Sequence, residues 1–169
     1  MTHPLVVQLR FARSEFVRGL KDVNDEEALR RFMPMNCISW IIGHLSYQEN
    51  TYWMKRAQGK DAAPQLEGLV GWDQPASTPP LADMWAAWQA VTTATDPYLD
   101  SLTTDTLQTF MMVNGKAHRE SVGSMLRRTT YHYWYHLGES QAIRQMLGHV
   151  GLPDFVGAIH DEAPYVPEG

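Results

Sequence analysis

The sequence is poor in cysteine and in long apolar runs, two features that mark secreted and membrane proteins. Its single cysteine, Cys37, cannot form an internal disulfide, so a disulfide scaffold is excluded and a reducing compartment is favoured. Apolar runs such as Ile41-Ile42 are far shorter than the roughly 20 residues that cross a bilayer. Charged residues appear early at the N-terminus, which does not fit a cleavable signal peptide. These absences predict a cytoplasmic protein without a membrane partner.

A concentrated positive charge is also absent from the sequence. The net charge is −5, and the lysines and arginines are scattered without forming a basic block. A nucleic-acid partner is therefore excluded, because such binding depends on clustered cationic side chains. The apolar fraction of 44% over 169 residues is sufficient for a buried core. We expect one domain over residues 1–169 that acts on a small-molecule substrate.

Apolar residues at steps of three and four predict four long helices. Pro4 favours an N-terminal turn, Asn36 is the expected N-cap of the second long helix, and Gly59 and Gly148 are expected terminators. Asn24 is the expected N-cap of a short additional helix. Pro97 is expected to kink or end the third long helix. The predicted fold class is all-α, an antiparallel four-helix bundle with long helices at residues 4–20, 36–58, 81–97 and 121–147.

Three connecting segments have their own signatures. Residues 59–80 are rich in glycine and proline, which predicts a long loop between the second and third long helices. Loops of this length often cover a binding site, and Trp72 lies within this one. Residues 107–118 contain an Asn114-Gly115 turn signal, which favours a small β-hairpin before the last helix. The proline-rich tail from about residue 150 is expected to lie extended over the surface.

The last helix carries a polar layer across its predicted buried face. The two ends of this face are apolar and its middle is polar. Burying a polar group without a hydrogen-bond partner costs about 1–3 kcal/mol, so stability of the fold alone does not explain the polar residues in the middle. The face contains Val122, Met125, Thr129, His132, His136, Glu139, Ser140, Ile143 and Leu147.

Two interpretations of the histidine pair in this layer remain open. His132 and His136 are four residues apart on one helix face, the spacing at which two imidazoles chelate a divalent ion. In the structural alternative, they are core histidines that bond to the backbone or to Glu139. His44 of the second long helix follows Gly43 and offers a third nitrogen. Three protein nitrogens would leave coordination positions for water or substrate, as in catalytic sites.

The segments WIIGHLSYQE and HYWYHLGESQAIRQMLG resemble the DinB/YfiT-like superfamily of metal-binding four-helix bundles. In that family, a histidine of the second long helix and a histidine pair of the last one bind a divalent metal. The resemblance therefore implies that His44, His132 and His136 are ligands of an ion such as Zn, Ni or Fe. Glu49 matches an acidic position that is frequent in the family. Glu139 stands where many members carry glutamine, so it is either a support for a ligand or an additional ligand.

The same resemblance implies a function. Members include bacillithiol- and mycothiol-dependent S-transferases and a thiol-dependent maleylpyruvate isomerase, and dimers are common. The leading hypothesis is a homodimeric metal-dependent thiol S-transferase that uses a low-molecular-weight thiol. One alternative is a metal-dependent hydrolase that activates water, with Glu139 or Glu49 as general base. Another is a non-catalytic, metal-stabilised binding or dimerisation module.

Overall fold

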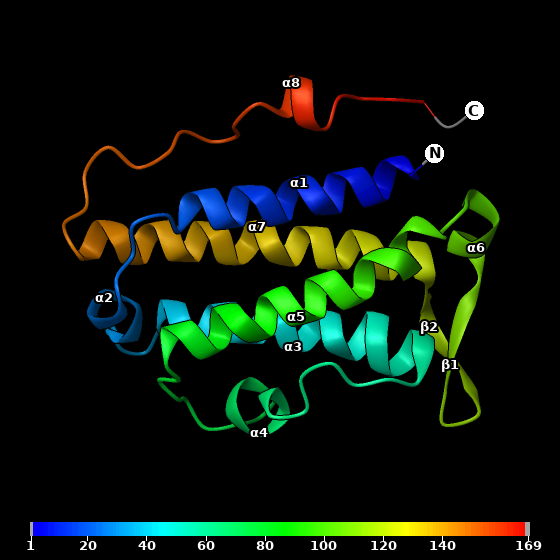
Figure 1. Cartoon of the computed structure of the whole chain (residues 1–169), viewed down its shortest axis with the longest axis horizontal. Helices are drawn as coiled ribbons and strands as arrows, with labels where there is room; N and C mark the ends of the chain where they lie inside the picture. Colours follow the sequence, from blue (N-terminus) through cyan, green and yellow to red (C-terminus); the bar gives the residue numbers. More distant parts are fainter. Residues whose placement is uncertain (1, 168–169) are drawn as a thin grey trace.

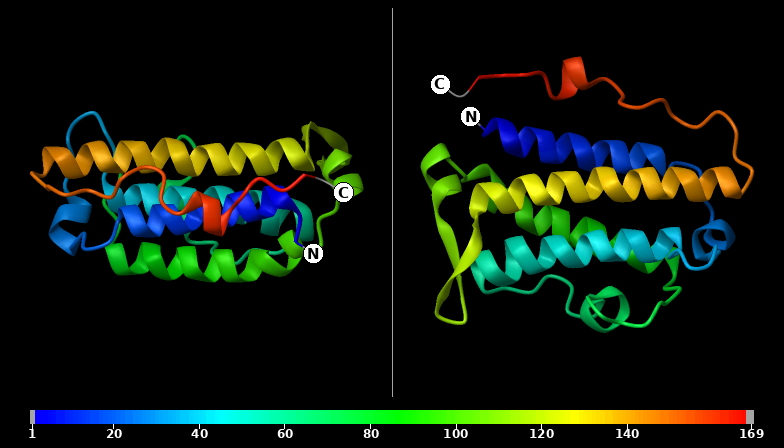
Figure 2. Two further views of the ribbon diagram at one scale, coloured as in Figure 1. Left: turned by 90° about the horizontal axis from the view of Figure 1, so that it is seen from above. Right: turned by 180° about the vertical axis from the view of Figure 1, so that it is seen from behind.

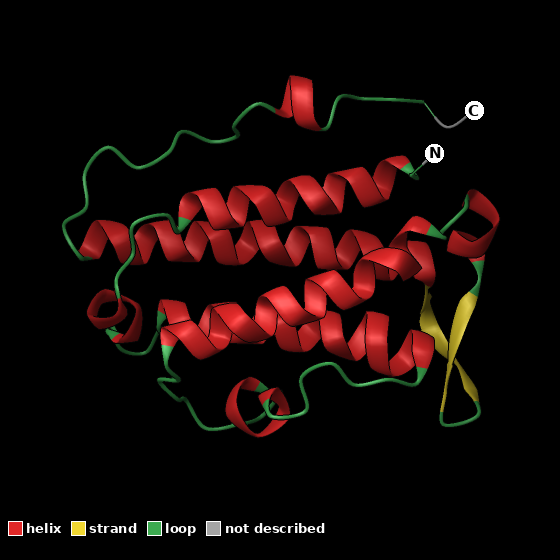
Figure 3. Ribbon diagram, viewed as in Figure 1, coloured by secondary structure: helices red, strands yellow, loops and turns green. Residues whose placement is uncertain are grey.

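The protein is built mainly of helices, with one small β-hairpin (Figures 1 and 3). The structure is a computed structural model and describes residues 2–167. The predicted all-α class is confirmed. The elements in chain order are α1 (Pro4–Gly19), α2 (Asp25–Leu29), α3 (Ile38–Glu49), the π-helix η1 (Asn50–Arg56), α4 (Leu66–Val70), α5 (Leu81–Asp100), α6 (Thr104–Gln108), β1 (Phe110–Val113), β2 (Lys116–Ser121), α7 (Val122–Met146) and α8 (Ile159–Glu162).

Local sequence signals mark the N-termini of several helices. Pro4 opens α1, where its missing N–H costs no helical hydrogen bond. Asn24 and Glu27 form a reciprocal capping box at α2, which confirms Asn24 as the N-cap. Ser121 caps α7 by accepting a hydrogen bond from the backbone N–H of Ser124. These signals are readable in the sequence because they depend on residues three positions apart.

The second long helix begins one residue later than predicted but ends at Gly59 as predicted. Its N-cap is Cys37, whose sulfur accepts from the backbone N–H of Trp40 at 3.4 Å, so the cap expected at Asn36 is wrong by one residue. After α3 the chain continues as η1, in which the backbone hydrogen bonds span five residues and widen the turn. Gly59 follows with φ of 65°, a left-handed conformation that glycine adopts without steric cost.

The four long helices lie side by side in two pairs (Figures 1 and 2). α1 packs along α7, α3 packs along α5, and α3 also contacts α7. The two helices of each pair run parallel: α1 and α7 point one way, and α3 and α5 point the other way (Figure 1). The expected antiparallel arrangement therefore holds between the two pairs but not within a pair. The physical reason is the long connection at residues 59–80, which returns the chain along the length of α3 before α5 begins.

The connections agree with the sequence in outline. The predicted loop at 59–80 contains the short helix α4, and α5 continues past Pro97 to Asp100. The hairpin expected near residues 107–118 is present, with β1 antiparallel to β2. Asn114 and Gly115 form its turn with φ of 52° and 75°.

The C-terminal tail lies along α1 (Figures 1 and 2). The backbone N–H of Gly157 donates to Glu15 Oε2 at 2.8 Å, and Gln8 Nε2 donates to the carbonyl oxygen of Ala163 at 2.9 Å. The tail is otherwise largely irregular, apart from α8.

The core fills the space between the long helices. The largest fully buried side chains include Phe16 of α1, Ile41 of α3, Trp53 of η1, Met84 of α5 and Tyr133 of α7. Across residues 2–167, no helix combines the length and apolar character needed to cross a membrane.

Candidate metal centre

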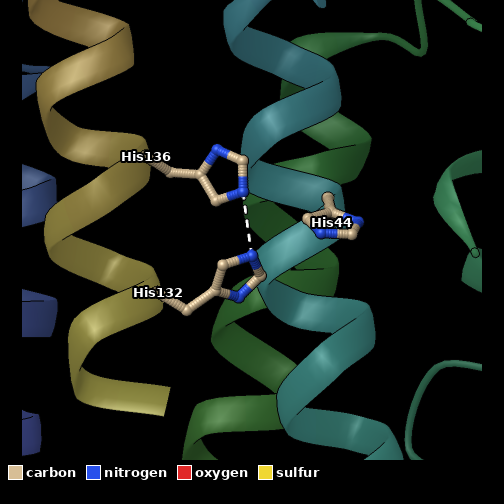
Figure 4. Close-up of side chains that lie close together, drawn as sticks. All are labelled: His44, His132 and His136. Carbon is tan, nitrogen blue, oxygen red and sulfur yellow. Dashed lines mark hydrogen bonds between the residues drawn. The ribbon is translucent and has the colours of Figure 1, made fainter. Parts of the chain in front are cut away.

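Three histidines converge from two long helices (Figure 4). His44 comes from α3, and His132 and His136 come from successive turns of α7. One ring nitrogen of each lies within 4.8 Å of those of the other two. The Nε2 atoms of His132 and His136 are 2.9 Å apart. The structure thus brings together the three residues that the sequence singled out.

The polar layer of α7 lies across the core as the helical periodicity predicts. Thr129, His136 and Ser140 are buried in its middle. Val122 and Ile143 are buried at the two ends, where the layer becomes apolar. His136 therefore lies buried between two apolar layers, whereas His44 and His132 are only partly buried.

His44 is held by a ring contact and a hydrogen bond. Its ring stacks on Trp40, with centroids 4.5 Å apart and planes 12° apart. Its Nδ1 lies 3.1 Å from the carbonyl oxygen of Val70, at the end of α4. A carbonyl accepts only, so Nδ1 carries the proton and Nε2 keeps its lone pair. Burial lowers the pKa of His44 from 6.5 to about 4, so the ring is neutral at physiological pH.

Gly43 permits the close packing beside His44. A Cβ at this position would meet Met84 Sδ at 2.4 Å and Val70 Cγ1 at 3.2 Å. The absence of a side chain at Gly43 therefore lets α5 and α4 approach α3 closely, which places the Val70 carbonyl within reach of His44.

Glu139 holds the second imidazole. Its Oε2 lies 2.7 Å from His136 Nδ1, one turn along α7. A carboxylate fixes Nδ1 as the donor, so the lone pair of His136 is on Nε2, which lies 2.9 Å from His132 Nε2. The hydrogen bond that the structural alternative anticipated is thus compatible with ligation, because it uses the opposite nitrogen.

His132 is the least satisfied of the three. Its Nδ1 is buried and has no hydrogen-bond partner in the described part of the chain. Burial, with a contribution from nearby His136, lowers the pKa of His132 from 6.5 to about 3. Its ring is therefore neutral at physiological pH, and a neutral imidazole is the form that binds a metal.

The chemistry of this donor set fits a divalent ion. Neutral imidazoles suit zinc, nickel and iron, and three of them leave further coordination positions open. In His44 and His136 the opposite ring nitrogen is engaged by Val70 and Glu139, as is usual for histidine ligands.

Glu49 lies outside this arrangement. It is fully buried, and its Oε1 accepts from Arg13 Nε at 2.9 Å and from the hydroxyl of Tyr133 at 2.7 Å. Arg13 also pairs with Asp96 at 2.8 Å. Within residues 2–167, the hydrogen bonds of Glu49 reach no histidine, so its surroundings are those of a buried ion pair that joins α1, α3 and α7.

A cavity of about 980 Å³ extends from the histidines to the surface. Trp72 of the long loop lies on its wall, and 77% of this residue is exposed. The wall is basic, a feature that the scattered positions of its arginines in the sequence did not predict, although Arg128 precedes His132 by one helical turn. The lining residues are His44, Tyr47, Gln48, Thr51, Tyr52, Arg56, Trp72, His118, Arg119, Glu120, Ser124, Arg127, Arg128, Tyr131 and His132.

The chain was compared with models of protein families and with curated proteins. A sequence model of the DinB superfamily matches residues 8–140, a segment that contains the three histidines and Glu139. A comparison with curated proteins found no match. Because the match covers well over half of the 169 residues, the chain belongs to the DinB superfamily.

Proposed function

We propose that the protein is a metal-dependent thiol S-transferase on a four-helix bundle, with His44, His132 and His136 as the metal ligands. The observation that carries this proposal is the convergence of three ring nitrogens within 4.8 Å at the end of an open cavity. His44 and His132 line that cavity, so a small molecule within it reaches the open side of the histidine cluster.

The chain's own groups prepare the site before any substrate enters. The Val70 carbonyl and the Glu139 carboxylate orient two of the rings and hold their protons on Nδ1. A divalent ion on these rings would supply a Lewis acid that lowers the pKa of a bound thiol or water. Burial keeps His44 and His132 in the neutral form that such an ion requires.

The thiol has to come from outside the chain. Cys37, the only cysteine of the sequence, is buried at the start of α3 and does not line the cavity. Burial also raises the pKa of its thiol, which disfavours the thiolate. In the proposed reaction, the sulfur of a low-molecular-weight thiol forms a bond to an electrophilic carbon. The leaving group departs with its electron pair, and the thiol proton passes to solvent.

Hydrolysis with a carboxylate base has less support. Glu139 is hydrogen-bonded to His136, and Glu49 is bound to Arg13 and Tyr133 in the core. Neither carboxylate is therefore free beside the open side of the cluster to take a proton from water. A thiol needs no such base, because lowering its pKa from about 8.5 is enough to produce thiolate at neutral pH.

The proposal is tested with zinc-loaded protein and a chlorodinitrobenzene electrophile. Bacillithiol, mycothiol, glutathione, cysteine and coenzyme A are supplied in turn, and arylation is followed by absorbance. We expect acceleration with at least one thiol by the wild type and none by His132→Ala. The matched control is His160→Ala, which replaces an exposed histidine of the tail. Equal rates for the wild type and His132→Ala with every thiol would refute the proposal.

The non-catalytic alternative predicts a different result in the same samples. Metal removal would lower the melting temperature, and no thiol would be consumed. The homodimer implied by the family stays a prediction, which sedimentation velocity checks.

A further inference from the structure

The cavity that ends at the histidines has a strongly basic wall. Four of the chain's 14 lysines and arginines line it, although the net charge of the protein is −5. They come from three separate elements: Arg56 from η1, Arg119 from β2, and Arg127 and Arg128 from α7. Among the described lining residues, Glu120 is the one carboxylate.

One of these arginines is already neutralised. Arg128 Nε lies 2.9 Å from Glu120 Oε2, and the second arm of this guanidinium also contacts the carboxylate. This ion pair links the start of α7 to the hairpin. It also occupies Glu120, the only carboxylate of the cavity wall among the described residues.

Among the described residues the other three arginines form no salt bridge, although the charge of Arg119 contributes to lowering the pKa of Glu120. The Arg56 guanidinium lies over the ring of Tyr52, 4.9 Å from its centroid, and Arg127 lies 3.5 Å from the hydroxyl of Tyr131. Arg119 is exposed on β2. Within residues 2–167, none of the three lies within ion-pair distance of a carboxylate.

This concentration of charge disfavours the empty protein, since like charges in one cavity repel each other. A negatively charged ligand removes the repulsion and uses guanidinium donors that match carboxylate and phosphate geometry. The volume of about 980 Å³ lies within the usual range for small-molecule sites.

We propose that the substrate bound in this cavity is a small polyanion with at least two carboxylate or phosphate groups. This inference rests on the proposed function and specifies the substrate class of the same site. Arg56, Arg119 and Arg127 bind the anionic groups near the mouth, while the reactive end of the molecule reaches His44 and His132. The hairpin, η1 and the first turns of α7 thus supply recognition, and the histidines of α3 and of the middle of α7 supply the chemistry.

Titration calorimetry at low ionic strength tests the inference without any turnover. The ligands are tricarballylate, which carries three carboxylates, fructose bisphosphate, and the neutral propane tricarboxamide, each added to zinc-loaded protein. We expect at least one polyanion to bind and the neutral amide not to bind. The tighter of the two polyanions identifies the carboxylate or phosphate class, and binding should weaken with added salt.

Arginine variants then locate the binding. Arg56→Gln, Arg119→Gln and Arg127→Gln should each raise the Kd about tenfold, the loss of roughly one charge-assisted hydrogen bond. Arg30→Gln is the matched control, because Arg30 also lies over an aromatic ring, that of Phe32, but outside the cavity. Unchanged Kd values in all three cavity variants, or equal binding of the neutral amide, would overturn the inference.

The two proposals fail separately. Arginine-dependent binding of a polyanion without any thiol transfer would refute the S-transferase and leave the binding site in place. Thiol transfer that is indifferent to the three arginines would refute the polyanion and leave the histidine cluster as the reactive centre.

Discussion

The imidazole Nδ1 of His44 lies 3.1 Å from the carbonyl oxygen of Val70, so a residue of the long connection orients a residue of the histidine cluster. Val70 ends the short helix α4, and this helix reaches His44 because Gly43 has no side chain. Site geometry and backbone packing are therefore linked at one glycine.

Gly43→Ala is expected to destabilise the protein and weaken its metal affinity. The added methyl group would overlap Met84 and press on Val70, and overpacking of this kind costs about 1–3 kcal/mol. This cost exceeds the helix-propensity gain of about 1 kcal/mol for alanine over glycine. The control is Gly138→Ala on α7, where nothing lies within 4 Å of the new Cβ. Thermal unfolding and zinc titration of both variants measure the difference, and equal stability would contradict the role given to Gly43.

Removing any one ligand should abolish stoichiometric metal binding. His44→Ala, His132→Ala and His136→Ala each leave two imidazoles, too few to hold the ion against competing ligands. Elemental analysis of the purified proteins is the measurement, with His160→Ala as the variant expected to keep its metal. Metal retained at wild-type stoichiometry in all three ligand variants would remove the basis of the site.

Glu139→Gln is expected to lower metal affinity by about tenfold, because it replaces a charged acceptor on His136 Nδ1 by a neutral one. The fold should be unaffected, since an amide oxygen still accepts the same hydrogen bond. Competition with a chromogenic chelator gives the affinity, and Glu26→Gln on exposed α2 is the control. A metal affinity equal to that of the wild type would show that the carboxylate does not support the ligand.

Glu49→Ala should separate stability from metal binding. It leaves Arg13 buried without its principal partner, and breaking a buried ion pair costs about 3–5 kcal/mol. Because the hydrogen bonds of Glu49 reach no histidine among residues 2–167, the folded fraction should keep its metal. Chemical denaturation and elemental analysis measure the two effects, and metal loss from the folded variant would restore Glu49 to the site.

The attachment of the tail to α1 should depend on pH. The pKa of Glu15 is held below 4.5, chiefly by the hydrogen bond from Arg18 and also by the backbone N–H of Gly157. A lowered pKa means that the stabilisation is present above pH 4.5 and is lost as the pH falls through the folded-state value. Hydrogen exchange at Gly157, corrected for its intrinsic pH dependence, should show less protection in acid. Glu15→Ala, which removes the acceptor, should lose most of this protection already at neutral pH, and unchanged protection would contradict the role of Glu15.

The sequence by itself determined the helices and the two pieces of the histidine cluster. Helix ends are local, so Asn24 and Ser121 could be recognised from residues three positions away. His132 and His136 share a face because one helix fixes their spacing, and the polar layer around them follows from the same periodicity. The match to the DinB superfamily covers residues 8–140, which include the three histidines.

Tertiary structure decided what depends on contacts between distant parts of the chain. Periodicity carries no information about helix direction, so the parallel pairing of α1 with α7 required the path of residues 59–80. Glu49 and Glu139 are the same residue type, yet packing placed one against Arg13 in the core and the other against His136. The arginines of the cavity are scattered in the sequence and meet only where η1, the hairpin and α7 converge. The periodicity of the sequence tells on which face of its own helix a side chain lies. Which residue that side chain contacts is decided by how the helices pack against one another.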